Sequence, residues 1–208
     1  MKTGVIDYGA GNLKSVCNTL DAIGADKKLV RTPADHDDIE ALIFPGVGAF
    51  GDCSRHLEQQ GLMEPLREWI AADRPFLGIC IGFQMLFDES EESPGAPGLA
   101  AFRGNVARFP TLPGLKVPHM GWNHLTVTNA SDPIWAGLGS TPYFYFVHSY
   151  FPQPEDRALT ASTTLYGTDF ASSIRRGNLL ATQFHPEKSQ AAGARLIENF
   201  LGLAQGGG

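Results

Sequence analysis

Short apolar runs alternate with amphipathic segments in the first half of the chain. Runs typical of buried strands occupy residues 4–8, 28–31, 41–44 and 75–80. Apolar residues at helical spacing predict a helix that ends near Gly24, a longer one over 50–72, and another that begins at Phe83. Strands that alternate with helices form right-handed βαβ units. We therefore expect an α/β fold, with an open, mostly parallel sheet and helices on both of its faces.

The second half has a different pattern. Residues 102–183 are rich in Thr, Tyr, Phe and Val and contain many turn residues, which predicts shorter, partly antiparallel strands that extend or flank the sheet. A closing helix is predicted around the apolar positions 194–201. Because no clear linker divides the chain, we expect one domain over residues 1–203 and a flexible, low-complexity tail over 204–208.

Composition and charge narrow the class of protein. The 208 residues include 22 acidic and 16 basic side chains, with no Lys/Arg cluster, which argues against binding a phosphate backbone. The chain has no apolar stretch long enough for a membrane span and no secretory segment at its start. We therefore expect a cytoplasmic protein with reduced thiols. Its three cysteines are an odd number, which excludes a closed disulfide framework.

Cys80 stands in the sequence Gly78-Ile79-Cys80-Ile81-Gly82, between an apolar strand and a helix. A nucleophile elbow has this context, because the sharp turn brings backbone segments close together and lifts the side chain above the sheet edge. A helix that starts directly after the cysteine also favours the thiolate. We interpret Cys80 as a nucleophile. Cys17 lies on an apolar helix face and is predicted to pack in the core, and Cys53 has no assigned role.

A nucleophilic cysteine needs a base, and the base needs an orienting group. His185 and Glu187 are separated by Pro186 at the end of a predicted strand. In extended backbone, side chains two residues apart share a face. We expect His185 to exchange the proton and Glu187 to fix its tautomer.

An oxyanion hole is also required. One predicted donor is the backbone N–H of Ile81. The second is expected from the loop at residues 44–50, FPGVGAF, where Gly46 and Gly48 allow N–H groups to point outward. His148, at the end of an apolar strand, and Gln84, one turn after the elbow, are expected near the same pocket. A metal pair at His119 and His124 is conceivable, but without supporting ligand spacing we expect no metal and no cofactor.

These blocks together resemble a known family. GICIGFQ at the elbow, PGVGAF upstream and FHPEKS downstream resemble class I, triad-type glutamine amidotransferase domains, which implies a flavodoxin-like core. IDYGAGNL near the start, KVPHMGWN at 116–123 and YFVHSYF at 145–151 resemble more closely the glutaminase subunits of imidazole glycerol phosphate synthase, from histidine biosynthesis. Many family members carry Pro-Gly-Gly at the oxyanion loop, whereas this chain has Pro-Gly-Val-Gly. The resemblance covers residues 6 to about 201.

The resemblance implies an activity and a partner. Cys80, His185 and Glu187 would hydrolyse L-glutamine to glutamate and ammonia through a cysteine thioester. Ammonia would pass to a cyclase subunit, a (β/α)₈ barrel that makes imidazole glycerol phosphate and AICAR ribonucleotide, in a heterodimer. The implied glutamine-binding and oxyanion positions are Val47, Gly48, Ile81, Gln84, His148, Ser149 and Tyr150. The implied interface positions are Asn12, Trp122, Tyr145 and Lys188.

The oxyanion loop suggests a hypothesis about control. If the Gly46–Val47 peptide held its N–H away from Cys80, one donor would be missing, at a cost of roughly 10²- to 10³-fold in rate. Partner binding would then turn this peptide inward.

Two other interpretations stay open at this point. The chain could serve a different synthase or act as a stand-alone γ-glutamyl hydrolase, with the same fold and thioester chemistry. It could also be a non-catalytic domain that kept the scaffold. The presence of all three triad residues argues against the second of these.

Overall fold

The computed structural model describes residues 1–9 and 13–206. The strands in this part of the chain are β1 (Lys2–Ile6), β2 (Asp26–Val30), β3 (Ala41–Phe44), β4 (Phe76–Ile79), β5 (Glu89–Ser90), β6 (Gly104–Arg108), β7 (His119–His124), β8 (Thr126–Val127), β9 (Tyr143–His148), β10 (Tyr150–Pro154), β11 (Thr160–Tyr166), β12 (Thr168–Arg176) and β13 (Leu179–Thr182). The α-helices are α1 (Leu13–Ala22), α2 (Phe50–Gln59), α3 (Met63–Ala71), α4 (Ile81–Gln84) and α5 (Gln190–Gly206). Short 3-10 helices are η1 (Pro33–His36), η2 (Pro133–Trp135), η3 (Arg157–Leu159) and η4 (Pro186–Lys188).

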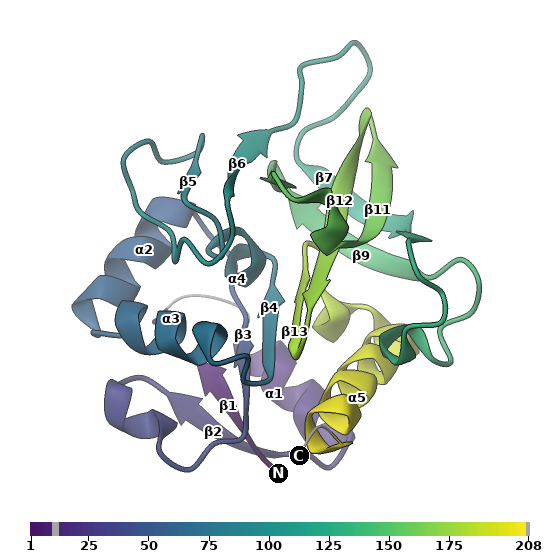
Figure 1. Ribbon diagram of the computed structural model, residues 1–208. Coiled ribbons are helices and arrows are strands. Elements are labelled where there is room, and N and C mark those ends of the chain that lie inside the picture. The colour runs from purple at the N-terminus through teal and green to yellow at the C-terminus, as the bar shows by residue number, and fades with distance from the viewer. Residues whose placement is uncertain (10–12, 207–208) are drawn as a thin grey trace.

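An eight-stranded sheet with the order β2-β1-β3-β4-β13-β12-β11-β8 forms the centre of the molecule (Figure 1). The five strands from β2 to β13 run parallel, and β12, β11 and β8 continue the sheet antiparallel. The order β2-β1-β3-β4-β13 is that of a flavodoxin-like core, in which ligands bind at the carboxyl edge of the strands. The expected open, mostly parallel sheet is therefore confirmed.

Helices cover both faces of this sheet, as expected. On one face α2 and α3 bury apolar side chains such as Phe50, Leu57 and Leu66. On the other face α1 and α5 bury side chains such as Leu20 and Phe200. Figure 1 shows α2 and α3 on one side of the strands and α5 on the other. No helix in the described part of the chain is long and apolar enough to cross a bilayer.

The second half builds two smaller sheets beside the carboxyl edge of the large one. One consists of β10, β6 and β5, and the other is an antiparallel ribbon of β7 and β9. Figure 1 shows these strands gathered above the central strands β4 and β13. The predicted flanking, partly antiparallel strands are therefore present, and they wall in the edge where a ligand would bind.

Three helix predictions need correction. The helix predicted over 50–72 is two helices, because Gly61, with φ of 68°, interrupts it between α2 and α3. The helix expected to begin at Phe83 begins at Ile81 and is a single turn that ends at Gln84. The closing helix α5 continues to Gly206, into the segment expected to be a tail, and residues 207–208 lie outside the described part.

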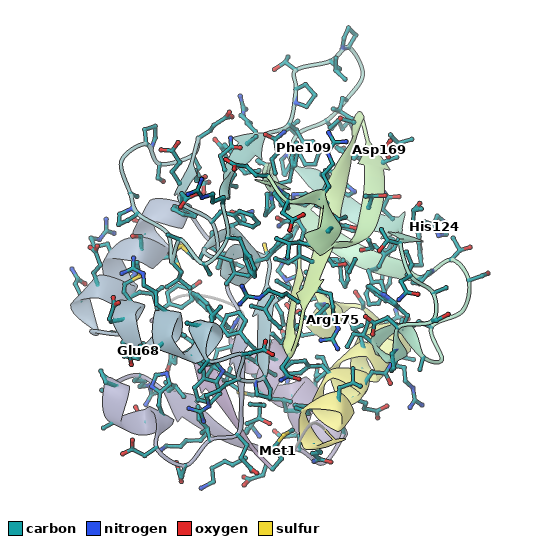
Figure 2. All side chains as sticks on the ribbon, viewed as in Figure 1. Met1, Glu68, Phe109, His124, Asp169 and Arg175 are labelled. Atoms are coloured by element: carbon teal, nitrogen blue, oxygen red, sulfur yellow. The ribbon has the colours of Figure 1, made fainter. Side chains whose placement is uncertain are left out.

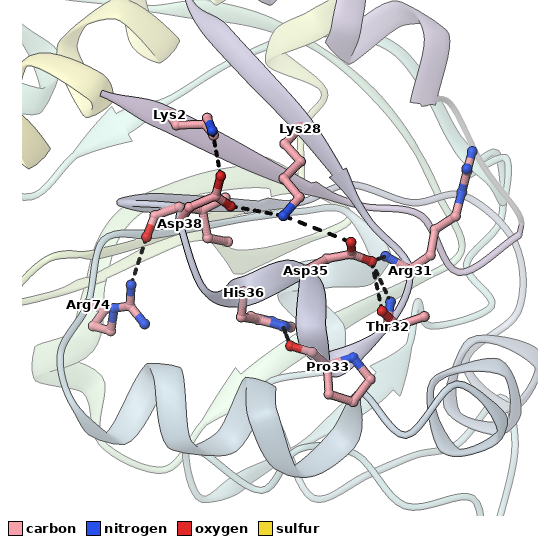
Figure 3. Close-up of polar contacts among 10 residues, drawn as sticks. Lys2, Lys28, Arg31, Thr32, Pro33, Asp35, His36, Asp38 and Arg74 are labelled. Atoms are coloured by element: carbon pink, nitrogen blue, oxygen red, sulfur yellow. Dashed lines mark hydrogen bonds and ion pairs between the residues drawn. The ribbon is translucent and has the colours of Figure 1, made fainter.

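Among the described residues, charged side chains rather than another strand lie along the β2 edge of the large sheet. Asp38 accepts hydrogen bonds from Lys2 and Lys28, and Lys28 also pairs with Asp35 (Figure 3). The backbone N–H groups of Arg31 and Thr32 donate to Asp35 and hold the pKa of its carboxyl below its usual value. Exposed pairs of this kind contribute little stability, but charges on an edge strand oppose pairing with another chain.

Candidate active site

Cys80 lies in a strained turn at the carboxyl end of β4. Its backbone has φ of 53° and ψ of −103°, a conformation that residues other than glycine rarely adopt. Gly78 and Gly82 are needed for the turn: a Cβ on Gly82 would lie 2.0 Å from the Phe44 carbonyl oxygen, and one on Gly78 would lie 2.8 Å from that of Gly82. The backbone N–H of Cys80 donates to Thr182 over 2.7 Å. The geometry is that of the predicted nucleophile elbow.

His185 is brought to Cys80 by the pairing of β13 with β4. These strands are parallel, with Thr182 opposite Ile79, so the residues that follow them leave the sheet side by side. The Nδ1 atom of His185 lies 2.7 Å from Glu187 Oε1, and both side chains are 1% exposed. Glu187 reaches His185 through the one-turn helix η4 rather than through the extended backbone expected from the sequence. The pair forms as predicted, by a different local geometry.

The electrostatics of His185 depend on its two acidic neighbours. Burial alone lowers the pKa of His185, but the charge of Cys80 and the carboxylate of Glu187 outweigh it and raise the pKa to about 10. The ring is therefore an imidazolium at neutral pH, with Nδ1–H donating to Glu187. Its Nε2 atom is buried and makes no hydrogen bond of good geometry with the described residues, but Cys80 is near enough to raise the pKa of the ring. Such contacts are often poorly aligned before substrate binds.

Gln183 is a site residue that the sequence analysis missed. Its Nε2 donates to Cys80 Sγ over 3.5 Å. Gln84 Nε2 donates to Gln183 Oε1 over 3.2 Å and to the Tyr150 carbonyl oxygen over 3.1 Å. The two amides thus join the elbow to the start of β10. Gln183 directly follows β13, and its contact with Cys80 depends on the pairing of β13 with β4, which no local motif reveals.

The loop at residues 44–50, which is predicted to supply an oxyanion donor, packs directly on the elbow. A Cβ on Gly46 would lie 2.0 Å from Ile81 Cγ2 and 2.3 Å from the Tyr8 hydroxyl, so the loop touches the residue that follows the nucleophile. Tyr8 is buried, and its hydroxyl donates to the Val47 carbonyl oxygen over 3.3 Å. Gly48 has φ of 112°, which a side chain would strain. Tyr8 lies in the IDYGAGNL block, but the sequence motifs gave no role to Tyr8 itself.

A cavity of about 450 Å³ opens in front of Cys80. Eight residues predicted for catalysis, glutamine binding or the oxyanion hole line it: Val47, Gly48, Cys80, Ile81, Gln84, His148, Ser149 and Tyr150. Lys188, which was predicted for the partner interface, also lines it. The sequence analysis missed three others, Glu92, Pro118 and Val147. The Glu92 carboxylate accepts from the backbone N–H of Phe50 over 2.8 Å, which fixes it at the start of α2. The cavity wall thus contains one acidic side chain, Glu92, and one basic side chain, Lys188.

The conceivable metal pair on β7 does not form. His119 is buried with its Nδ1 atom 3.1 Å from His148 Nε2, whereas His124 is exposed and packs against Tyr143 with the two rings tilted. Residues five apart on a strand face opposite sides, which explains the separation. Figure 2 places His124 at the outer side of the molecule, away from the aromatic cluster around Phe109. The described residues include no group of three or more His, Cys, Asp or Glu arranged to hold a metal ion.

The outer face of the β7–β9 ribbon carries exposed aromatic and apolar side chains. Trp122 is 37% exposed, Tyr143 44% and Met120 63%. The Trp122 ring stacks on Tyr143 with 5.5 Å between centroids, and Tyr145 packs edge-on against Trp122. Of the predicted interface residues, Trp122 and Tyr145 thus lie together on this face and Lys188 lies at the cavity. Asn12 lies outside the described residues.

The other two cysteines are free thiols that stand apart from this chemistry. Cys17 on α1 is half-buried rather than enclosed in the core. Cys53 on α2 is buried beside Tyr8, and burial strongly raises the pKa of its thiol, so it is not a nucleophile at neutral pH.

Comparisons with known proteins agree with this geometry. A family model for class-I glutamine amidotransferases matches residues 4–203. A solved structure titled as a glutamine amidotransferase superposes with a TM-score of 0.76 at 23% identity, covering 98% of each chain. PurLQS from Thermotoga maritima superposes with a TM-score of 0.75 at 16% identity, covering 97% of each. At these identities the solved structures show the shared fold, and the fold and site together define the amidotransferase class.

Relatives with higher sequence identity indicate the group within this class to which the chain belongs. The HisH subunit of imidazole glycerol phosphate synthase from Methylococcus capsulatus is 48% identical over 206 residues, covering 95% of this chain and 94% of its own. The HisH subunit from Trichodesmium erythraeum is 45% identical over 198 residues, covering 95% of this chain and 92% of its own. The chain belongs to the class-I glutamine amidotransferase family and, within it, to the HisH subunits of imidazole glycerol phosphate synthase.

Proposed function

We propose that the protein is a glutaminase that hydrolyses L-glutamine to glutamate and ammonia, and that it passes ammonia to the cyclase subunit of imidazole glycerol phosphate synthase in histidine biosynthesis. The observation that carries the chemistry is the strained turn at Cys80, which lines the cavity, with the buried His185–Glu187 pair behind it and outside the cavity lining. The acceptor of the ammonia is inferred from the 45–48% identity to HisH subunits.

The reaction follows from these groups. The Cys80 sulfur attacks the side-chain amide carbon of glutamine, and the oxygen becomes an oxyanion held by backbone N–H groups of Ile81 and the 46–48 loop. His185 gives its Nε2 proton to the nitrogen, the C–N bond breaks and ammonia leaves. Water then attacks the γ-glutamyl thioester while His185 takes its proton. The C–S bond breaks, which releases glutamate and restores Cys80.

The cavity suits an amino-acid zwitterion. Glutamine carries an ammonium and a carboxylate on its α-carbon, and the cavity wall offers the Glu92 carboxylate and the Lys188 ammonium. The amides of Gln84 and Gln183 and the backbone of 148–150 supply neutral hydrogen-bonding groups near Cys80. A few polar groups in a closed wall are what fix the orientation of a small ligand.

We propose that the cyclase binds the exposed face of the β7–β9 ribbon. Trp122 and Tyr143 present stacked aromatic surface there, and aromatic residues of this kind dominate binding energy at interfaces. Ribbon and cavity are adjacent, because β9 ends at His148 in the cavity wall. Ammonia released at Cys80 would then appear beside the partner. We place the heterodimer in the cytoplasm, which the three free thiols support.

The test is glutamate release from glutamine by the purified chain, alone and with a histidine-pathway cyclase and its ribonucleotide ligand. We expect the cyclase complex to stimulate release and Cys80→Ala to abolish it. A Cys53→Ala variant is the matched control and should respond as the parent does. Equal release by Cys80→Ala and the parent would remove Cys80 from the mechanism. Activity that no cyclase affects would exclude the proposed partner.

A further inference from the structure

Behind the cavity wall, a chain of hydrogen bonds connects His148 to strand β7. His148 Nδ1 lies 2.8 Å from the Tyr150 carbonyl oxygen, and its Nε2 lies 3.1 Å from His119 Nδ1. His119 Nε2 lies 3.3 Å from Asn123 Nδ2. Both histidine rings are buried. Nothing in the sequence motifs or the proposed mechanism assigns a role to His119 or Asn123.

The groups at the two ends of this series of hydrogen bonds determine which group donates in each bond. A carbonyl oxygen only accepts, so His148 Nδ1 carries the proton and donates to Tyr150. In a neutral ring Nε2 is then an acceptor, so His119 must donate from Nδ1 and accept at Nε2. Burial lowers the pKa of His148 to about 3 and that of His119 to about 4, so both rings are neutral at pH 7.

The other end of the chain is fixed as well. The Asn123 side-chain oxygen accepts from the backbone N–H of His124 over 2.8 Å, so its Nδ2 faces inward. Nδ2 has two protons, and it donates one to His119 and one to the Leu165 carbonyl oxygen over 3.1 Å. The amide is fully bonded and ties the chain to β11. The sequence of donors is therefore Asn123, His119, His148, ending at the Tyr150 carbonyl.

Packing restricts the His119 ring to this orientation. It lies between the rings of Phe146 and Tyr166, stacked on both, with centroids 4.7 and 3.9 Å away. Phe109 and Phe170 meet it edge-on. The ring cannot rotate without losing these contacts, so it transmits the position of β7 to His148.

We propose that His119 is a positioning residue for the cavity: with Asn123 it holds the His148 ring and, through the Tyr150 carbonyl, the wall at residues 148–150 that faces the substrate. The inference rests on the proposed glutaminase function. One consequence concerns His148 itself. Both of its ring nitrogens are engaged inside the protein, so it offers glutamine its ring face and its backbone rather than a side-chain hydrogen bond. The Tyr150 carbonyl also accepts from Gln84, so the same wall is tied to the elbow.

The first test is spectroscopic. Nitrogen-15 NMR of the histidine rings in the full chain at pH 7 should give His119 and His148 as neutral Nδ1–H tautomers, the minor form for free histidine. Neither should titrate between pH 5.5 and about 8, the range around the ordinary histidine pKa. An Nε2–H tautomer at His119, or titration near pH 6.5, would overturn the chain of donors.

The second test is kinetic and uses His119→Phe, which keeps a ring in the stack but removes both hydrogen bonds. In the cyclase complex we expect KM for glutamine to rise about five- to tenfold, the size of one lost hydrogen bond, with kcat within about twofold of the parent. His36→Phe, the same substitution in η1 and outside both the cavity lining and the β7–β9 ribbon, is the matched control and should leave both constants unchanged. An unchanged KM in folded His119→Phe contradicts the proposal. If the parent protein itself has no glutaminase activity, that result contradicts the proposed function instead. The histidine tautomers measured by NMR then still test the series of hydrogen bonds.

Discussion

At the scale of single residues, His185 holds a proton that the proposed reaction would use. Burial opposes this charge, and the interactions of the ring with Cys80 and Glu187 more than compensate for it. A proton held at Nε2, with Nδ1–H fixed by Glu187 at 2.7 Å, is ready for delivery to the departing nitrogen. The state of His185 therefore depends on the presence of Cys80.

Cys80→Ala should lower the pKa of His185 from about 10, because it removes the strongest raising influence and leaves the lowering effect of burial. A folded pKa above the ordinary 6.5 means that protonated His185 contributes stability that is fully present below pH 6.5 and lost as pH rises toward 10. In the variant this loss should occur at lower pH. NMR titration of the ring measures the shift, and an unchanged pKa would contradict the assigned ion pair.

Gly46→Ala should displace the oxyanion loop, because the added methyl would lie 2.0 Å from Ile81 Cγ2 and 2.3 Å from the Tyr8 hydroxyl. We expect kcat for glutamine in the cyclase complex to fall toward the roughly 10²- to 10³-fold cost of one lost oxyanion donor. The folded state, checked by circular dichroism, should persist. A variant with the parent kcat would show that this loop does not carry a donor.

Local motifs made some of these residues predictable. Cys80, His185 and Glu187 each lie in a short pattern whose chemistry depends on neighbours in sequence. Glu92 and Gln183 were missed because their roles depend on distant partners, the start of α2 and the elbow. The Glu187 geometry was also mispredicted: a 3-10 turn after Pro186 replaces the extended strand end.

At the scale of elements, the start of α5 supports the catalytic pair. The Ser189 hydroxyl donates to the His185 carbonyl oxygen over 2.7 Å, and the Tyr145 N–H donates to that hydroxyl over 3.0 Å. The one-turn helix η4 is thereby held between α5 and the β7–β9 ribbon. Gly193 lies against it so closely that a Cβ would be 1.7 Å from the Pro186 carbonyl oxygen.

Two glycines on α5 give a matched pair of substitutions. Gly193→Ala should lower the free energy of unfolding by about 1–3 kcal/mol, because its methyl collides with η4. Gly202→Ala has open space around it and should raise that free energy by up to about 1 kcal/mol, because alanine favours a helix interior. Urea unfolding of both variants checks this. The same sign for both would contradict the packing of α5 on η4.

The bounds of helices and strands were predicted best where a single pattern of apolar residues runs through the whole segment. The strand at 41–44 was predicted with its observed bounds, since four apolar residues end at a Pro-Gly turn. The helix predicted over 50–72 failed because Gly61 interrupts a continuous apolar stripe, which periodicity alone does not reveal. The short α4 also weakens the idea that a helix N-terminus activates Cys80. One turn supplies little dipole.

At the scale of the whole molecule, the sheet order creates the site. Residues about 100 positions apart meet because β13 inserts beside β4, and their carboxyl ends form one edge. The sequence predicted the parallel core, but not that the last strand joins it there, because strand order depends on contacts between distant segments. The sequence predicted flanking, partly antiparallel strands, but not that they form two separate sheets that wall in the cavity.

The exposed ribbon face yields a prediction about assembly. Trp122→Ala should weaken binding to the cyclase about tenfold or more, because it removes the stacked aromatic surface on β7–β9. Glu68→Ala, an exposed position on α3 that Figure 2 places on the far side of the molecule, is the control. Calorimetric titration measures both affinities. Parent-like binding by Trp122→Ala would move the interface elsewhere.

The proposed reaction requires a covalent bond between Cys80 and the substrate. Rapid acid quench of the cyclase complex during glutamine turnover, followed by mass spectrometry of its peptides, tests for that bond. We predict a γ-glutamyl adduct on the peptide that contains Cys80 and none on those of Cys17 or Cys53. An adduct on either other cysteine, or parent-level turnover by Cys80→Ala, would contradict the account.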